Sequence, residues 1–184
     1  SDRNMFQGIG EFMPTPDVAL SVRKITRHAS ERIARRAFEL ARRRRRQVTA
    51  VHKANAFHVT DGLFLECCRK VAQEFPDCRL DTVIVDACAA LLVRDPGRFD
   101  VLCATNFHAD ILSDLASELS GGLGLAGSIN HNETMCCAQA QHGSAPDIQG
   151  QDRANPTSLI LSAALMLDWL GERRGDARLA EAGA

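Results

Sequence analysis

The sequence predicts an α/β fold, because short apolar runs typical of strands alternate with segments of helical periodicity along most of its length. Two such pairs are clear: the apolar runs at residues 82–85 and 99–104 are followed by helix-like segments at residues 87–93 and 111–119. The sequence contains no internal repeat, and 184 residues are enough for one sizeable domain or for part of a larger one.

The first part of the chain is expected to hold a loop, a strand and a helix. Pro14 and Pro16 interrupt residues 11–16, which we therefore expect to form a loop, and the apolar residues in 18–25 predict a strand. A helix then begins near Ser30, because apolar residues recur from there at helical spacing.

That helix ends in five consecutive arginines, residues 42–46. One interpretation is a nucleic-acid patch; the other, which we prefer, is that these cations are favoured at a helix C-terminus and face solvent. A net charge of −1 argues against attraction of the whole protein to nucleic acid or to membranes, and the sequence has no apolar run of about 18 residues. We therefore expect no nucleic-acid partner and no membrane partner.

The middle of the chain predicts another strand and helix. The strand is short, at residues 48–51, and the helix covers residues 62–75. Thr60 and Asp61 are expected to cap this helix and Pro76 to end it.

The last third predicts less regular structure. A glycine-rich crossover at residues 121–125 leads to a short strand at 135–138, and a final helix covers residues 158–170. The tail from Gly171 is charged and rich in Ala and Gly, so we expect it to fray.

Seven cysteines are present, including two adjacent pairs, at residues 67–68 and 136–137. There is no Cys-x-x-Cys motif, which argues against a zinc site. Residues 1–5 lack a signal-peptide pattern. These features predict reduced, buried thiols in a cytoplasmic protein.

Three aspartates form the most informative group. Asp110 and Asp114 are four residues apart in a predicted helix, which places both carboxylates on one face. Asp86 follows a second apolar run and could supply a third oxygen donor. Such a group suits Mg²⁺ or Mn²⁺, which prefer hard oxygen ligands, although an amphipathic helix with solvated acids would show the same spacing.

Five motifs then occur in one order: Val51-His52-Lys53-Ala54-Asn55, Val85-Asp86-Ala87, Asn106-x-x-x-Asp110-Ile-Leu-Ser-Asp114, Gly121-Gly-Leu-Gly-Leu-Ala and His142-Gly-Ser-Ala-Pro-Asp-Ile. Together they resemble the isocitrate/isopropylmalate dehydrogenase family of metal-dependent β-decarboxylating dehydrogenases, over residues 3–169. Residues 58–66 resemble the isocitrate side of the family more closely.

The resemblance implies roles for individual residues. Asp86, Asp110 and Asp114 would bind Mg²⁺ or Mn²⁺, with Asp86 reaching into the site of a neighbouring subunit. Lys53 would be the base that acts across the dimer on the substrate, with Asp86 as its catalytic neighbour, and Arg3 would hold a substrate carboxylate.

The implied reaction is the oxidative decarboxylation of a 2-hydroxy acid. The metal would lower the pKa of the substrate hydroxyl, a hydride would pass to NAD⁺, and the same cation would stabilise the enolate formed when CO₂ leaves. A partly desolvated lysine beside the metal is suited to accept the hydroxyl proton.

The resemblance also implies an NAD site. Asp147 followed by Ile148 resembles the members that use NAD, because an acid there accepts a ribose hydroxyl and repels a 2′-phosphate. The residues expected to contact NAD are Asn106, His142, Gly143, Ser144, Ala145, Pro146, Asp147, Ile148 and Asn155.

Departures from the family pattern matter as well. The family's opening third, with its glycine-rich turn and arginine-rich substrate segment, and its closing helices after Trp169 have no counterpart here. The family's catalytic tyrosine aligns with Gly10, and the sequence contains no tyrosine. Gln139 replaces a usual Glu. His108, beside Asp110, could be a ligand or an acid, or a solvated residue at a helix start.

Two hypotheses follow. The chain is either the catalytic, dimer-forming part of such a dehydrogenase or a non-catalytic relative that acts as a regulatory or binding subunit. The fold would be an incomplete two-domain subunit, with residues 1–121 as the smaller dimerising domain and 122–184 as part of a larger, cofactor-binding one. We expect a homodimer that shares its site, or a partner chain that supplies the missing half, because the segment from Leu123 would otherwise expose apolar faces.

Overall fold

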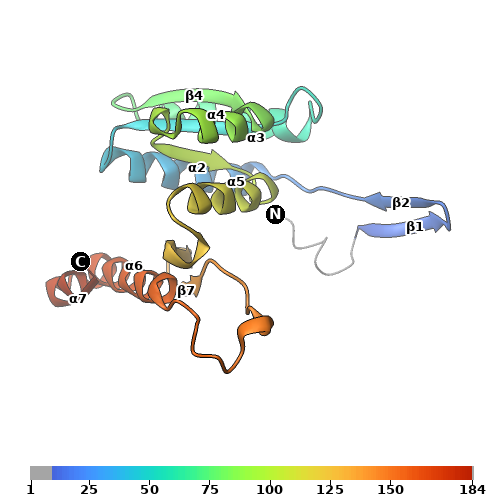
Figure 1. Cartoon of the computed structure of the whole chain (residues 1–184). Coiled ribbons are helices and arrows are strands. Elements are labelled where there is room, and N and C mark those ends of the chain that lie inside the picture. Colours follow the sequence, from blue (N-terminus) through green and yellow to red (C-terminus); the bar gives the residue numbers. More distant parts are fainter. Residues whose placement is uncertain (1–9, 184) are drawn as a thin grey trace. The chain divides into compact units, whose positions relative to one another are not determined.

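The computed structural model describes residues 10–183, which form two compact units that are described here one at a time (Figure 1). The first unit extends to Ser113 and the second begins at Asp114. Helices and a parallel sheet confirm the α/β prediction. The predicted division into a dimerising domain and a cofactor-binding domain after residue 121 stays a prediction.

The first unit is built on a parallel sheet of three strands, β3 (Gln47–His52), β4 (Arg79–Ile84) and β5 (Val101–Ala104), in the order β4-β3-β5. The central strand β3 is the most buried, as its continuous apolar and β-branched residues predict. Because the strands are parallel, their carboxyl ends meet at one edge, where His52 pairs with Ile84.

Helices α2 (Arg27–Arg42) and α3 (Thr60–Ala72) form the core of this unit together with the sheet. The Thr26 hydroxyl accepts the Ala29 N–H at 3.3 Å, so α2 begins three residues before the predicted start at Ser30. The core brings together Ala34, Phe38, Val48, Ala50, Phe64, Val71 and Phe75. Phe38 and Phe75 stack with ring centroids 5.2 Å apart.

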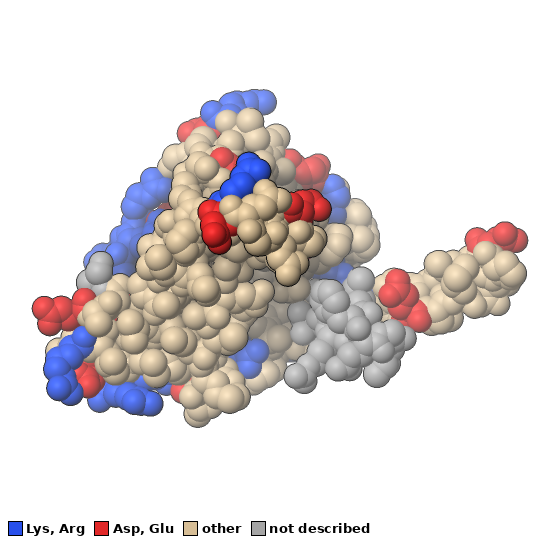
Figure 2. Space-filling view, turned by 60° about the horizontal axis from the view of Figure 1, so that its bottom comes forward, with Lys and Arg blue, Asp and Glu red and all other residues tan. Residues whose placement is uncertain are grey.

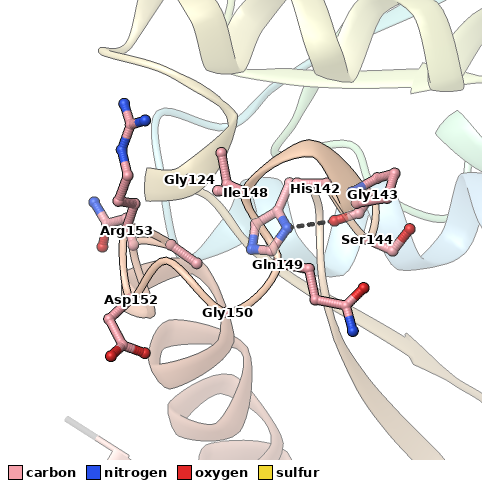
Figure 3. Close-up of a pocket in the computed structure, with 13 residues that line it drawn as sticks. Gly124, His142, Gly143, Ser144, Ile148, Gln149, Gly150, Asp152 and Arg153 are labelled. Carbon is pink, nitrogen blue, oxygen red and sulfur yellow. Dashed lines mark hydrogen bonds between the residues drawn. The ribbon is translucent and has the colours of Figure 1, made fainter.

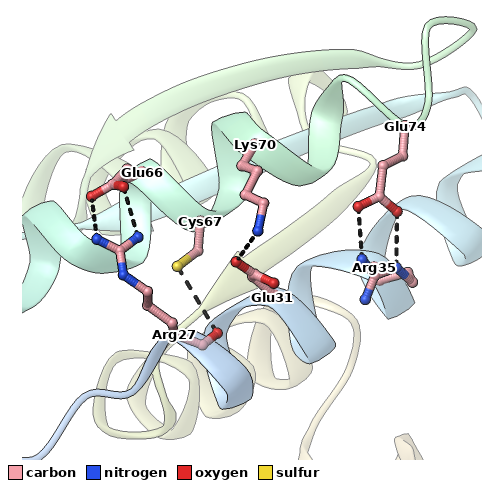
Figure 4. Close-up of polar contacts among 7 residues, drawn as sticks. All are labelled: Arg27, Glu31, Arg35, Glu66, Cys67, Lys70 and Glu74. Atoms are coloured by element: carbon pink, nitrogen blue, oxygen red, sulfur yellow. Dashed lines mark hydrogen bonds and ion pairs between the residues drawn. The ribbon is translucent and has the colours of Figure 1, made fainter.

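Three exposed ion pairs connect α2 to α3 and to the turn that follows it (Figure 4). They join Arg27 to Glu66 at 2.6 Å, Lys70 to Glu31 at 2.8 Å, and Arg35 to Glu74 at 2.7 Å. Exposed pairs of this kind contribute roughly 0–1 kcal/mol each. Their main effect is on register, because each pair is satisfied only when the two helices are aligned as they are here.

The arginine run at the end of α2 is exposed, as predicted, but it is not simply solvated. Arg42 pairs with Asp77 at 2.7 Å, and Arg44 Nε donates to Asp100 Oδ1 at 2.9 Å. The Arg45 N–H donates to the other oxygen of Asp100 at 2.9 Å. These contacts hold the helix end against the loops that enter β4 and β5.

Helices α4 (Val85–Arg94) and α5 (Asn106–Leu119) follow β4 and β5 almost without a loop. Both begin earlier than predicted, α5 by five residues. Their first turns therefore lie at the carboxyl edge of the sheet, where ligands bind in open α/β sheets.

A hairpin precedes the first helix, and here the sequence prediction was wrong. The predicted loop at residues 11–16 is mostly strand β1 (Glu11–Thr15), paired antiparallel with β2 (Val18–Ser21), which ends before residue 25. Every residue of both strands is exposed, including Met13. Pro14 has no main-chain N–H to donate, and it is tolerated because no further strand of the described residues pairs with this hairpin. The visible surface of the hairpin in Figure 2 is mostly uncharged.

The second unit packs an antiparallel pair, β6 (Gly127–His131) and β7 (Cys136–Ala140), against α6 (Thr157–Arg174). Part of β7 was predicted, whereas β6 was not. Two serines of α6, Ser158 and Ser162, are fully buried. Ser162 bonds to both strands: its Oγ donates to the Gln139 carbonyl of β7 at 2.8 Å and accepts the Ser128 N–H of β6 at 2.9 Å. The small size of serine lets the helix lie close to Gly127, where a Cβ would stand 3.1 Å from Leu161.

The expected frayed tail is also helical. Helix α6 continues to Arg174 and ends at Gly175, whose φ of 64° is the left-handed conformation that suits glycine. Helix α7 (Ala177–Gly183) then packs on α6, where Gly171 leaves no room for a side chain. The prediction of fraying was wrong because contact with α6 stabilises a segment too short to be helical alone.

The described residues contain no helix with the length and apolar content of a membrane span. The seven cysteines are free thiols, four of them buried: Cys67, Cys68, Cys88 and Cys103.

Candidate functional site

Lys53 and Asp86 lie together at the carboxyl edge of the parallel sheet. Lys53 directly follows β3, and Asp86 is in the first turn of α4, directly after β4. The Lys53 ammonium donates to Asp86 Oδ1 at 2.5 Å, and this hydrogen bond lowers the pKa of the Asp86 carboxyl below its usual value. The structure thus brings two residues of the predicted site into contact, although they are 33 positions apart in sequence.

Asp110 and Asp114 are both on α5 and both exposed, at the spacing that places them on one helical face. Asp114 Oδ1 accepts a long hydrogen bond, 3.4 Å, from Gln141 Nε2. Their hard oxygen donors fit Mg²⁺ or Mn²⁺. Within the described part of the chain, however, no three His, Cys, Asp or Glu residues are grouped to hold a metal. Asp86 does not join the other two aspartates within one chain, so a complete site would need donors from elsewhere.

A loop of the second unit lines a cavity of about 820 Å³ (Figure 3). Of the residues predicted to contact the cofactor, seven line it: His142, Gly143, Ser144, Ala145, Pro146, Ile148 and Asn155. Gly124, Gln149, Gly150, Asp152, Arg153 and Ala154 complete the lining. The lining residues between 149 and 154 were not predicted, because no motif marks them.

Two predicted cofactor residues do not line this cavity. Asp147 is exposed, and its main-chain carbonyl accepts a hydrogen bond from Gln151 Nε2 at 2.9 Å. Asn106 is the first residue of α5 and belongs to the other unit. Their roles toward NAD stay predictions.

The loop is shaped by its backbone and anchored at its beginning. Ala145 and Gly150 have positive φ angles of 44° and 74°, which bend the chain around the cavity. His142 Nδ1 lies 2.8 Å from the Gly143 carbonyl (Figure 3). Gln141, just before the loop, donates its N–H to Ser158 of α6 at 3.0 Å, which holds the loop's two ends together.

The cavity has the size and composition of many ligand sites. Ligand sites are commonly roughly 300–1,000 Å³, mostly apolar, with a few polar groups. Asp152 and Arg153 are its charged lining residues, and Gly143 and Gly150 leave open space where a side chain would stand. Main-chain polar groups of such a loop can approach a ligand closely.

Three other residues singled out in the sequence have different outcomes. Arg3 lies outside the described residues. Gly10, at the position of the family's tyrosine, has φ 92°, and its carbonyl accepts the Val22 N–H at 2.7 Å, which closes the hairpin. His108 is buried, at 4% exposure, so the solvated interpretation was wrong.

The position of Asp61 was not predicted correctly. It was expected to cap α3 with Thr60, but the residue before the helix is Val59, which makes no side-chain capping bond. Asp61 instead lies inside the first turn and is fully buried. Its position on the same helical face as Phe64, Leu65 and Cys68 was the available signal.

The parallel sheet carries polar residues at its carboxyl edge, and the second unit contains a loop-lined cavity; both features are typical of α/β proteins that bind small molecules. The chain belongs to the isocitrate/isopropylmalate dehydrogenase family, whose sequence model matches residues 5–183. The match extends beyond residue 169, where the resemblance was expected to end.

Individual relatives agree with this assignment. The chain is 50% identical to an isocitrate/homoisocitrate dehydrogenase of Thermus thermophilus, over 90% of this chain and 50% of that protein. It is 45% identical to a regulatory subunit of the mitochondrial NAD isocitrate dehydrogenase of Dictyostelium discoideum, over 85% of this chain and 44% of that protein. The crystal structure of isocitrate dehydrogenase from Methylococcus capsulatus matches with a TM-score of 0.85 and 47% identity, over 94% of this chain and 52% of that one. The chain therefore spans about half the length of these relatives.

Proposed function

We propose that this chain provides the base, metal-binding and nucleotide-binding residues of an NAD-dependent dehydrogenase that oxidatively decarboxylates a 2-hydroxy acid of the isocitrate or isopropylmalate type. The observation that carries the proposal is the contact of Lys53 with Asp86 at the carboxyl edge of the parallel sheet, 2.5 Å between Nζ and Oδ1. Membership of the family supports the reaction class.

Each residue has a role that follows from its position. Lys53 Nζ, on a side chain that is 28% exposed, is close enough to solvent to meet a substrate and would hold or release the hydroxyl proton. Asp86 orients that ammonium. Asp110 and Asp114 would hold Mg²⁺ or Mn²⁺, a cation that stabilises negative charge developing on substrate oxygens when bound.

The loop cavity would hold the adenosine part of NAD. His142 and Ile148 offer flat and apolar surface to the base, and Asp147, at the outer side of the loop, would accept the ribose hydroxyls of NAD and repel the 2′-phosphate of NADP.

A homodimer with a shared site is part of the proposal. Large apolar side chains are exposed on both units, among them Phe107, Ile111, Leu159 and Ile160, each between 53% and 62% exposed. Exposed apolar faces of this kind mark protein contacts. A second copy would let Asp86 approach the aspartates of the neighbouring α5, and a separate partner chain is the alternative source of further site residues.

The second candidate is a non-catalytic regulatory or binding subunit. It is favoured by the absence of tyrosine from the sequence, with Gly10 at the family's tyrosine position, and by the similarity to a regulatory subunit. The retained Lys53 and aspartates favour the enzyme.

The test is NAD⁺ reduction by the purified chain with Mn²⁺ and, in turn, isocitrate, homoisocitrate, 3-isopropylmalate and tartrate. We expect turnover with one acid, its loss in Lys53→Met, and its retention in Lys70→Met, the matched change of an exposed lysine on α3. A folded chain that binds NAD⁺ but turns over none of the acids would favour the non-catalytic subunit.

A further inference from the structure

Asp61 is a fully buried carboxylate at the centre of a polar cluster. Its Oδ1 pairs with Arg23 Nη1 at 2.6 Å, and its Oδ2 accepts the main-chain N–H of Lys53, also at 2.6 Å. A buried carboxylate is strongly unfavourable unless it is paired and hydrogen-bonded, and Asp61 meets that requirement with one donor on each oxygen.

The cluster joins four separate segments of the first unit. Arg23 lies between the hairpin and α2, Lys53 at the end of β3, and Asp61 on α3. The second arm of Arg23 donates to Thr105 Oγ1 at 2.6 Å, in the junction between β5 and α5. His108, in the first turn of α5, has its Nδ1 3.4 Å from Thr105 Oγ1 and 3.8 Å from Asp61 Oδ2.

We propose that Asp61 is a positioning residue: it fixes the main chain at Lys53, and through Arg23 and Thr105 it fixes that point relative to the first turn of α5. The Lys53 side chain starts from a residue just beyond the strand, where the sheet no longer holds the backbone. The hydrogen bond from Lys53 to Asp61 replaces that support. The functional consequence rests on the proposed role of Lys53 as the base; the structural part does not.

Only a carboxylate can serve both donors. An asparagine at position 61 has one oxygen and one NH₂ group, so it could accept from Arg23 or from Lys53, and its NH₂ would then face the other donor. Asp61→Asn therefore removes one of the two bonds whichever way the amide turns, with almost no change in side-chain volume.

Asp100 provides a matched control within the same unit. Its side chain is 1% exposed, it accepts from an arginine and from a main-chain N–H, and it lies at the other end of the sheet, before β5. Asp100→Asn thus imposes a similar structural loss away from Lys53.

The first measurement is amide hydrogen exchange at Lys53 by NMR in the unmodified chain. We expect protection there, and in Asp61→Asn exchange at Lys53 faster by about tenfold or more, because a hydrogen bond to a charged acceptor is lost. In Asp100→Asn the Lys53 amide should keep its protection. An unprotected Lys53 amide in the unmodified chain would overturn the proposal even if Asp61→Asn failed to fold, and so would unchanged exchange in a folded Asp61→Asn.

The second measurement separates this proposal from the proposed function. If the chain turns over a 2-hydroxy acid, Asp61→Asn should lower kcat by about tenfold or more while KM changes little, and Asp100→Asn should change neither. Absence of turnover in the unmodified chain would contradict the proposed function and leave the exchange result to decide the role of Asp61.

Discussion

Ser158 links the loop that lines the cavity to the rest of the second unit, and its removal has a calculable effect. Its fully buried hydroxyl donates to the Ala126 carbonyl at 2.5 Å and accepts the Gln141 N–H at 3.0 Å. Ser158→Ala leaves both main-chain groups without this partner, and a buried unsatisfied group costs about 1–3 kcal/mol. Two such groups are lost, and partial hydration next to the loop that follows Gln141 reduces the loss, so we expect the free energy of unfolding to fall by about 2–4 kcal/mol.

The single tryptophan, Trp169 on α6, makes this prediction measurable by urea unfolding followed by its fluorescence. Amide exchange at Gln141 should accelerate in the same variant. The control is Ser120→Ala, where an exposed hydroxyl bonds the Ala116 carbonyl at the end of α5 and the change should stay within about 0.5 kcal/mol. A loss in Ser158→Ala as small as that of the control, with unchanged exchange at Gln141, would refute the reasoning.

Three further changes have definite expected outcomes. Arg46 has a φ of 58°, so Arg46→Gly should raise the free energy of unfolding by about 0.5–1 kcal/mol in urea titration, because glycine adopts this conformation without strain. Gly171→Ala should lower it by about 1–3 kcal/mol, since the new Cβ would stand 2.6 Å from a main-chain nitrogen of α7. Burial lowers the pKa of His52 and of His108 below the usual 6.5, so near and below that pH the unfolded chain binds protons that the folded chain does not. The free energy of unfolding should therefore be highest above about pH 6.5 and decrease as the pH falls below it.

Each of these has its own check. Arg45→Gly, at a neighbouring position without positive φ, should not stabilise the protein, and equal gains in both variants would contradict the strain argument. For the Gly171 prediction, unchanged stability would mean that α7 does not pack as described. For the pH prediction, a urea midpoint independent of pH between about 7.5 and 5.5 would contradict burial of the two histidines.

The parallel sheet and its helices could be predicted from sequence, because the strands are short, mostly apolar runs and the helices carry apolar residues at helical spacing. The buried residues of β3, 48–51, are three apolar residues and a β-branched threonine, and α2 carries apolar residues at helical spacing. Strand β1 could not be predicted, because it is exposed on both faces and contains a proline, so the usual alternation is absent. Strand β6 was missed for a related reason: Ser128 and Asn130 are polar, and the strand is stabilised by serine hydroxyls of α6.

The candidate site was likewise predictable only in part. Lys53, Asp86, Asp110 and Asp114 were named because motifs mark them, and the structure brings the first two into contact. Spacing could have indicated that Asp61 is buried, because it shares a helical face with apolar residues, but an aspartate near a helix start is usually a cap and only the fold shows which groups its carboxylate binds. Sequence motifs record the residues that perform chemistry more readily than those that hold them in place.

The measurement that tests the central claim most directly is Mn²⁺ binding to the purified chain by calorimetry, with the oligomeric state measured on the same sample. We predict binding in a dimer, its loss in Asp110→Asn, and its retention in Asp168→Asn, which changes an exposed aspartate of α6 outside the proposed site. A folded dimer that binds no Mn²⁺ would contradict the metal-binding role of the aspartates and favour the non-catalytic hypothesis.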